Sequence, residues 1–106
     1  MMVAKRKPVR QAVADNAPWK PAPYGLEQAG AIQALARGDA APHQQQLALK
    51  WIVETVCGYY DISFRPGGLE GERESNFAEG KRHVGAQVVK MTRLNLSRLK
   101  KEERNG

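Results

Sequence analysis

The chain has 106 residues, of which 42% are apolar and 7% aromatic, and it carries a formal net charge of +6. This length fits one domain with a modest core, and self-association would help such a core. A single cysteine, Cys57, excludes an internal disulfide, and no apolar stretch resembles a signal peptide or approaches the roughly 20 residues of a membrane span. We therefore expect a soluble protein of a reducing compartment.

The charge is unevenly placed along the chain. Residues 1–20 contain five basic residues and one acidic residue, residues 21–80 contain four and eight, and residues 81–106 contain eight and two. The chain is an acidic middle between two basic ends, which predicts that recognition of acidic or phosphate-bearing partners is concentrated in the ends.

Residues 1–24 are predicted to form a flexible, basic and proline-rich arm. They lack apolar periodicity and contain four prolines, a composition that favours extended, polyproline-like backbone. One interpretation is simple disorder. The other is that Trp19 and Tyr24 dock on a neighbouring subunit or partner, while Lys5, Arg6 and Lys7 meet an acidic surface or phosphate.

Two helices are expected in residues 25–60. Apolar residues recur at helical spacing over Leu26–Arg37, and Gly38 is a natural left-handed stop. A break at residues 39–42 also starts the next helix, because proline is tolerated in a first turn. Residues 44–60 are the strongest periodic segment, with an apolar face wide enough for contact on two sides. Cys57 lies in that face as a small buried apolar residue, and Gly58 ends or loosens the helix.

A third helix is predicted after the turn signal of residues 65–68. It is expected to begin between Glu72 and Ser75, with acidic residues at the positive end of its dipole. Its buried stripe is expected to consist of Phe77, Val84, Val88 and Met91. Gly80 and Gly85 mark places where a neighbouring helix could approach closely. Beyond Leu94 the chain is expected to continue as a frayed basic tail.

These elements predict an all-α fold, with two main helices, a short N-terminal helix and a proline-rich extended arm. The expected division is an arm at residues 1–24, a helical domain at 25–96 and a basic C-terminal tail at 97–106.

Catalysis is not indicated by the residues. His43 and His83 lie on different predicted helices without metal-ligand spacing, and no phosphate-binding loop is present. Cys57 sits in an apolar helix face, where a thiolate is disfavoured. We expect a non-enzymatic protein without cofactor, metal or small-molecule substrate.

Binding is the alternative that the charges favour. On the third helix and the tail, Lys81, Arg82, Lys90, Arg93 and Lys101 lie off the apolar stripe and form a positively charged ridge. This ridge is either a solvated face or a site for sequence-independent contact with a phosphate backbone.

A strip of acidic residues allows a second interpretation of the basic ridge, in which the ridge binds another protein chain and not a phosphate backbone. Glu70, Glu72, Glu74 and Glu79 could pair with the basic ridge of a second copy, giving a homo-oligomer. Because exposed ion pairs contribute only about 0–1 kcal/mol each, aromatic residues such as Trp51 and Trp19 would anchor the contact.

Residues 31–96 resemble a family of small helical tailed-bacteriophage proteins that are encoded among the late, head-assembly genes. The stretches that carry the resemblance are residues 34–38 (ALARG), 42–44 (PHQ), 49–52 (LKWI), 60–67 (YDISFRPG) and 77–85 (FAEGKRHVG). The resemblance implies a phage product in the host cytoplasm or the virion, near capsid assembly or genome packaging. A phage virion protein or DNA is then the natural partner, and a small inhibitor of a host protein is the alternative.

Overall fold

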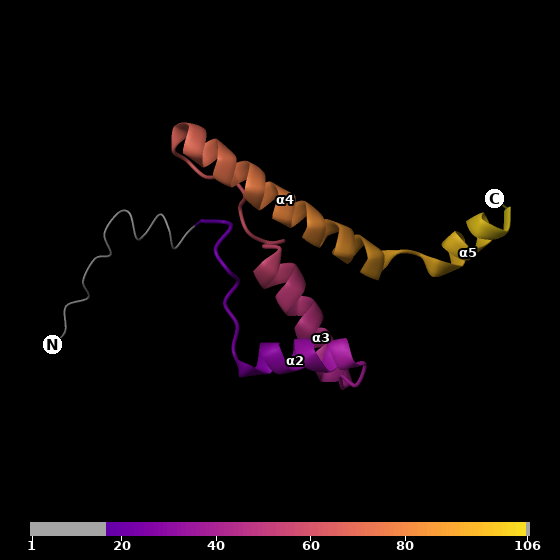
Figure 1. Cartoon of the computed structure of the whole chain (residues 1–106). Coiled ribbons are helices and arrows are strands. Elements are labelled where there is room, and N and C mark those ends of the chain that lie inside the picture. The colour runs from indigo at the N-terminus through magenta and orange to yellow at the C-terminus, as the bar shows by residue number, and fades with distance from the viewer. Residues whose placement is uncertain (1–16, 106) are drawn as a thin grey trace.

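The computed structural model describes residues 17–105. In this part of the chain all regular structure is helical, which confirms the all-α prediction (Figure 1). The elements are α2 (Leu26–Arg37), α3 (Pro42–Lys50), the π-helical turn η1 (Trp51–Val56), α4 (Gly68–Arg93) and α5 (Leu96–Asn105).

Helices α2 and α3 pack against each other through a seam of alanines. Ala31, Ala34 and Ala48 are buried, and small side chains on both helices let the two backbones approach closely. The bounds of α2 are those predicted, because Gly38 takes a left-handed conformation with φ 80° and its N–H is bonded to the carbonyl of Leu35.

The second predicted helix begins as expected, with the proline of the preceding break in its first turn, and it ends short of Tyr60. It starts at Pro42. Proline fits this position because backbone N–H groups in the first turn of a helix have no carbonyl partner within the helix, so the lack of an N–H costs no hydrogen bond. The helix continues into η1 and stops at Val56, so the predicted extension to Tyr60 is wrong. Gly58, with φ 62°, turns the chain out of the helix. Val53 and Cys57 are buried, as predicted for the thiol.

Helix α4 packs on η1 through a glycine. Gly85 is buried, and a Cβ at this position would lie 2.9 Å from the Cβ of Cys57 and 3.3 Å from the Cβ of Tyr59. The close helix approach predicted at Gly85 is therefore confirmed, whereas at Gly80, for which the same was predicted, no atom of the described residues lies within 4 Å of a Cβ. In Figure 1, α3 and η1 run up to the middle of α4, and α2 lies at the far end of α3.

The start of α4 differs from the prediction. The helix begins at Gly68 and not between Glu72 and Ser75, because Gly67 and Gly68 both adopt positive φ and turn the chain directly into the first helical turn. Gly71 is buried under the preceding loop, where a Cβ would lie 2.5 Å from the carbonyl oxygen of Pro66.

The stripe predicted as the buried face of α4 is largely exposed. Phe77 is 47% exposed, Val84 52% and Met91 67%, whereas Val88 is partly buried. Periodicity places these residues on one side of the helix, but the side that meets η1 carries Gly85 instead. The expectation of a core stripe is wrong for this reason.

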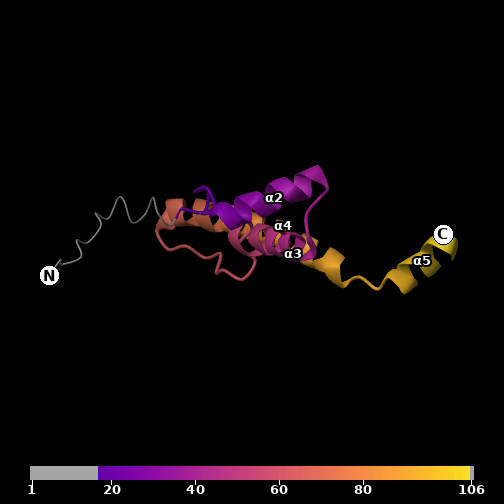
Figure 2. The same ribbon diagram turned by 90° about the horizontal axis from the view of Figure 1, so that it is seen from below.

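The C-terminal residues form a helix of their own. The chain leaves α4 at Leu94, whose backbone is extended, and Asn95 caps α5 by accepting a hydrogen bond from the N–H of Arg98 at 3.0 Å. The segment beyond Leu94, expected to be a frayed tail, is thus a separate helix with an N-cap. It projects away from the other helices in both views (Figure 2).

The molecule is elongated, with principal-axis extents of 63 × 35 × 22 Å. Its radius of gyration is 18.7 Å, compared with about 13 Å for a compact chain of this length. Within residues 17–105, none of the helices has the length and apolar character needed to cross a membrane.

Replacing Gly85 by valine should lower the free energy of unfolding by about 1–3 kcal/mol, because the new side chain overlaps Cys57 and Tyr59. Urea unfolding followed by circular dichroism measures this change. The matched control is Gly30→Val in α2, where no atom lies within 4 Å of the position that a Cβ would take; its effect should stay within about 0.5 kcal/mol. Equal effects of the two changes would contradict the role given to Gly85.

Candidate functional site

Residues 17–25 form a strap across η1 and α4. It consists of a turn at residues 17–20, closed by a hydrogen bond from the N–H of Lys20 to the carbonyl of Ala17 at 3.1 Å, followed by residues 21–25 without regular structure. The carbonyl of Pro23 accepts a hydrogen bond from the indole Nε1 of Trp51 at 2.9 Å, and the carbonyl of Pro18 accepts one from Nζ of Lys81 at 2.7 Å. Backbone outside helices leaves such carbonyls without helical partners, so they are open to side-chain donors. The strap is therefore fixed to the helices at two points.

The aromatic residues predicted for an interface have different surroundings. Trp19 lies edge-to-face on Phe77 of the same chain, with ring centroids 6.0 Å apart, and is about half exposed. Trp51 is partly buried and bonded to the strap, whereas Tyr24 is 73% exposed. Two of the three residues thus contact their own chain.

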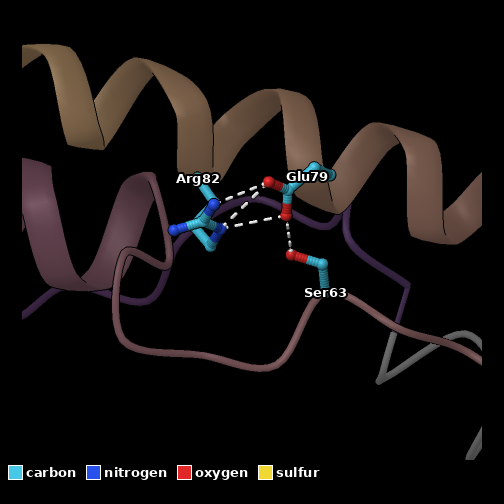
Figure 3. Close-up of polar contacts among 3 residues, drawn as sticks. All are labelled: Ser63, Glu79 and Arg82. Atoms are coloured by element: carbon cyan, nitrogen blue, oxygen red, sulfur yellow. Dashed lines mark hydrogen bonds and ion pairs between the residues drawn. The ribbon is translucent and has the colours of Figure 1, made fainter.

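Residues 58–67 form a loop that is tied to α4 by a polar cluster. The hydroxyl of Ser63 donates to Oε2 of Glu79 at 2.5 Å, and the guanidinium of Arg82 binds the same carboxylate through Nε and Nη2 at 2.7–3.2 Å (Figure 3). Figure 3 shows Glu79 between the loop hydroxyl and the guanidinium one turn further along α4. Two charge-assisted contacts therefore meet at one carboxylate.

A second loop contact lies one turn earlier on α4. The hydroxyl of Ser75 accepts a hydrogen bond from the N–H of Arg65 at 2.7 Å and donates to the carbonyl of Gly71 at 2.7 Å. Nη1 of Arg65 donates to the carbonyl of Ile62 at 2.6 Å. The loop is thus held along one side of α4 in a fixed conformation.

The polar cluster changes the titration of its members. The hydrogen bond from Arg82 and then the one from Ser63 lower the pKa of Glu79 from its ordinary 4.5 to about 2. The carboxylate in turn raises the pKa of Arg82. Glu79 therefore stays ionised throughout the neutral range, which suits a permanent clamp and does not suit a proton donor or acceptor near pH 7.

The hollows of the surface differ in size and lining. A cavity of about 30 Å³ beside the polar cluster, lined by Pro18, Cys57 and Lys81 among others, has the size of one or two water molecules. Two shallow hollows are larger and mostly apolar. One of about 330 Å³ lies between Tyr24, α2 and Trp51, and one of about 340 Å³ lies between α3, η1 and the C-terminal part of α4.

The predicted basic ridge is divided by the fold. Lys81 and Arg82 are engaged with the strap and with Glu79, whereas Lys90 and Arg93 are exposed at the C-terminal end of α4 and Lys101 is exposed on α5. Lys5, Arg6 and Lys7 lie outside the described residues. Among the described members of the ridge, the exposed positive charge is therefore concentrated at the end of α4 and on α5.

The predicted acidic strip occupies the first half of α4. Glu70 pairs with Arg73 at 3.6 Å on the surface, Glu72 is exposed and Glu74 is partly buried. Glu79 is the member that the loop and Arg82 engage. Helix α4 is thus acidic in its first half and basic in its second.

Large apolar side chains are unusually exposed. Leu26 is 90% exposed, Ile62 79% and Phe64 71%, and Tyr60, Leu69 and Leu96 are each more than half exposed. Among the described residues no large side chain is fully buried, and the core consists of alanines, Val53 and Cys57. Such exposed apolar surface is typical of protein interaction sites.

Sequence reasoning missed the loop contacts of Ser63, Arg65 and Ser75. The serines carry no signal at the sequence level, because Ser63 and Glu79 meet only when the loop folds back on α4. Ile62 and Phe64 follow the second predicted helix directly, and their apolar character gives no sign that they face outward. Their exposure follows from the way the polar cluster holds the loop.

Comparison with known proteins gives no relative for this chain: no family model, curated protein or solved structure matches it.

The pKa of Glu79 should be near 2 in the folded protein, and NMR titration of its side-chain carboxyl carbon measures it. Arg82→Gln should raise this pKa more than Ser63→Ala does, because the guanidinium is the larger cause of the shift. Since the folded-state pKa lies below the unfolded value, the stability contributed by this carboxylate is complete above pH 4.5 and is lost as the pH falls toward 2. An ordinary pKa of Glu79 in the wild type would contradict the clamp.

Proposed function

We propose that this protein is an assembly protein of a tailed-phage particle, and that it acts by binding other protein subunits and not by catalysis. The observation that supports this proposal most directly is the exposure of its large apolar side chains over a core of small residues. A folded chain of this kind gains stability when another protein covers the exposed surface. The sequence resemblance supplies the setting of head assembly or genome packaging.

The loop of residues 58–67 is the clearest contact surface in this proposal. Ile62 and Phe64 are exposed, although hydrogen bonds from Ser63 and Arg65 hold their backbone against α4. A loop that is already held in one conformation loses less conformational entropy when it binds. The polar cluster therefore supports the presentation of apolar side chains to a partner.

The experiment is mass spectrometry of purified particles and assembly intermediates of the encoding phage, combined with loop variants. The wild-type chain should co-purify with particles or intermediates, and Ile62→Ser/Phe64→Ser should reduce its amount at least tenfold without loss of helical circular dichroism. Gln33→Ala on the exposed side of α2 is the matched control. Absence of the wild-type chain from every particle and intermediate would overturn the proposal.

A second candidate function is contact with DNA through the C-terminal end of the chain. Residues 90–105 contain Lys90, Arg93, Arg98, Lys100, Lys101 and Arg104 against two glutamates, and all six basic residues are exposed. Arg98 is paired with Glu102 at 3.2 Å, a surface pair that water and salt weaken. A projecting helix with this charge can lie along a phosphate backbone without reading bases.

Binding to duplex DNA should weaken steeply between about 50 and 200 mM salt, as fluorescence anisotropy measures. Lys100→Gln/Lys101→Gln should reduce the slope of log affinity against log salt by about two, because each phosphate contact contributes roughly 0.9. Arg73→Gln, exposed near the start of α4, is the control and should leave the slope unchanged. Lack of binding at low salt would exclude this candidate.

A further inference from the structure

One side of α4 is left uncovered by residues 17–105. It carries Phe77, Val84, Val88 and Met91, three of which are about half exposed or more. Trp19 touches this stripe at Phe77, and η1 packs on a different side of the helix, at Gly85. The stripe is therefore an apolar helix face with one small contact at its N-terminal end.

Gly80 lies beside this stripe and has no explanation among the described contacts. A glycine inside a helix reduces helix stability, and no atom of the described chain lies within 4 Å of a Cβ built at this position. Gly85 on the same helix is different, because Cys57 and Tyr59 occupy the space that a side chain would need. Gly80 leaves room for the close approach of another backbone from outside.

The residues of the stripe are arranged symmetrically about Val84. Phe77 and Met91 each lie seven residues from Val84, and Gly80 and Val88 each lie four residues from it. If a second α4 ran antiparallel with Val84 on the twofold axis, Phe77 would face Met91 and Gly80 would face Val88 of the other copy. Each large residue would then have an apolar counterpart, and Gly80 would make room for Val88.

The charges of α4 favour the same direction of pairing. Residues 68–79 carry four glutamates and one arginine, whereas residues 80–93 carry two lysines and two arginines and no acidic residue. In an antiparallel pair centred on Val84, residues 75–93 of the two helices overlap, and the glutamates of each first half lie at or just beyond the basic C-terminal end of the other α4. Parallel helices would place like charges together. Because such exposed pairs add little affinity, the charges select the direction and the apolar stripe supplies the contact.

We propose that α4 pairs antiparallel with α4 of a second copy, centred on Val84, and buries Phe77, Gly80, Val88 and Met91 in an isologous contact. Centred on Val84, the two 26-residue helices overlap over residues 75–93, about 28 Å at a rise of 1.5 Å per residue, which includes the whole stripe. This inference rests on the proposed function only in assuming that protein covers the exposed apolar surface. It names a second copy as the occupant of this particular face.

Disulfide trapping tests the pairing in the full-length chain. In a Cys57→Ala background, Val84→Cys should form a disulfide-linked dimer under mild oxidation, because the twofold axis brings residue 84 opposite itself. Phe77→Cys and Met91→Cys, each tested alone, should form at least tenfold less disulfide-linked dimer than Val84→Cys. A mixture of the two variants should form a disulfide between residue 77 of one copy and residue 91 of the other. His83→Cys, exposed on another side of α4, is the matched control.

The outcomes separate the possible arrangements. Efficient self-linking at residues 77 and 91, whether or not residue 84 also links, would indicate parallel pairing and overturn the proposal. No dimer from any stripe variant would also overturn it, since some other part of the chain or another protein would then cover the stripe. Particle association of the Ile62 and Phe64 loop is measured separately, so failure of the pairing is distinguishable from failure of the proposed function.

A charge on the twofold axis provides a test without cysteines. Val84→Glu should raise the dimer dissociation constant at least tenfold in sedimentation equilibrium, because two like charges would face each other. His83→Glu should change it less than threefold. Helical circular dichroism of both variants controls for folding, and an unchanged dissociation constant for Val84→Glu, or a strictly monomeric wild type, contradicts the proposal.

Discussion

The position of α4 depends on its close contact with η1 at Gly85. The absence of a side chain at this residue lets Cys57 and Tyr59 come within van der Waals distance of the helix backbone. The hydrogen bonds that join α4 to the loop and the strap fall on Ser75, Glu79 and Lys81, within three turns of this contact. The contact between α4 and η1 thus determines where the loop of residues 58–67 and the strap lie.

A core of small residues has a direct consequence for the surface. Alanines at the α2–α3 seam and a glycine at the α4 contact bring backbones together, but they bury little apolar area. The larger apolar residues of α4 and of the loop remain on the outside. A short chain with so little buried area has limited stability, and association is the general means by which such folds gain more. Self-pairing of α4 and binding by the loop would both use apolar surface that residues 17–105 do not cover.

Local sequence signals predicted the parts of the fold that local chemistry determines. The bounds of α2 follow from apolar spacing and the left-handed Gly38, and the burial of Cys57 follows from its place in an apolar run. Gly85 could be predicted as a close approach because a glycine inside a helix lowers its stability, but the same reasoning at Gly80 finds no described atom within 4 Å. These features depend on a few neighbouring residues.

The features that could not be predicted depend on contacts between distant segments. Periodicity placed Phe77, Val84 and Met91 on one face, but it could not tell whether the same chain or another covers that face. The sequence also could not show that Glu79 would be held by Ser63 from a folded-back loop, or that Trp51 would donate to Pro23. Aromatic character marked Trp19 and Trp51 as residues that would make contacts, whereas the identity of their neighbours within the chain required the fold.

If a second copy completes the exposed apolar surface, folding and association are coupled. Thermal unfolding at protein concentrations from about 1 to about 100 µM tests this coupling most directly, because the Tm of a folded dimer depends on mass action. The Tm is expected to rise by several degrees over this range. A single cooperative transition with the same Tm at every concentration would contradict the pairing.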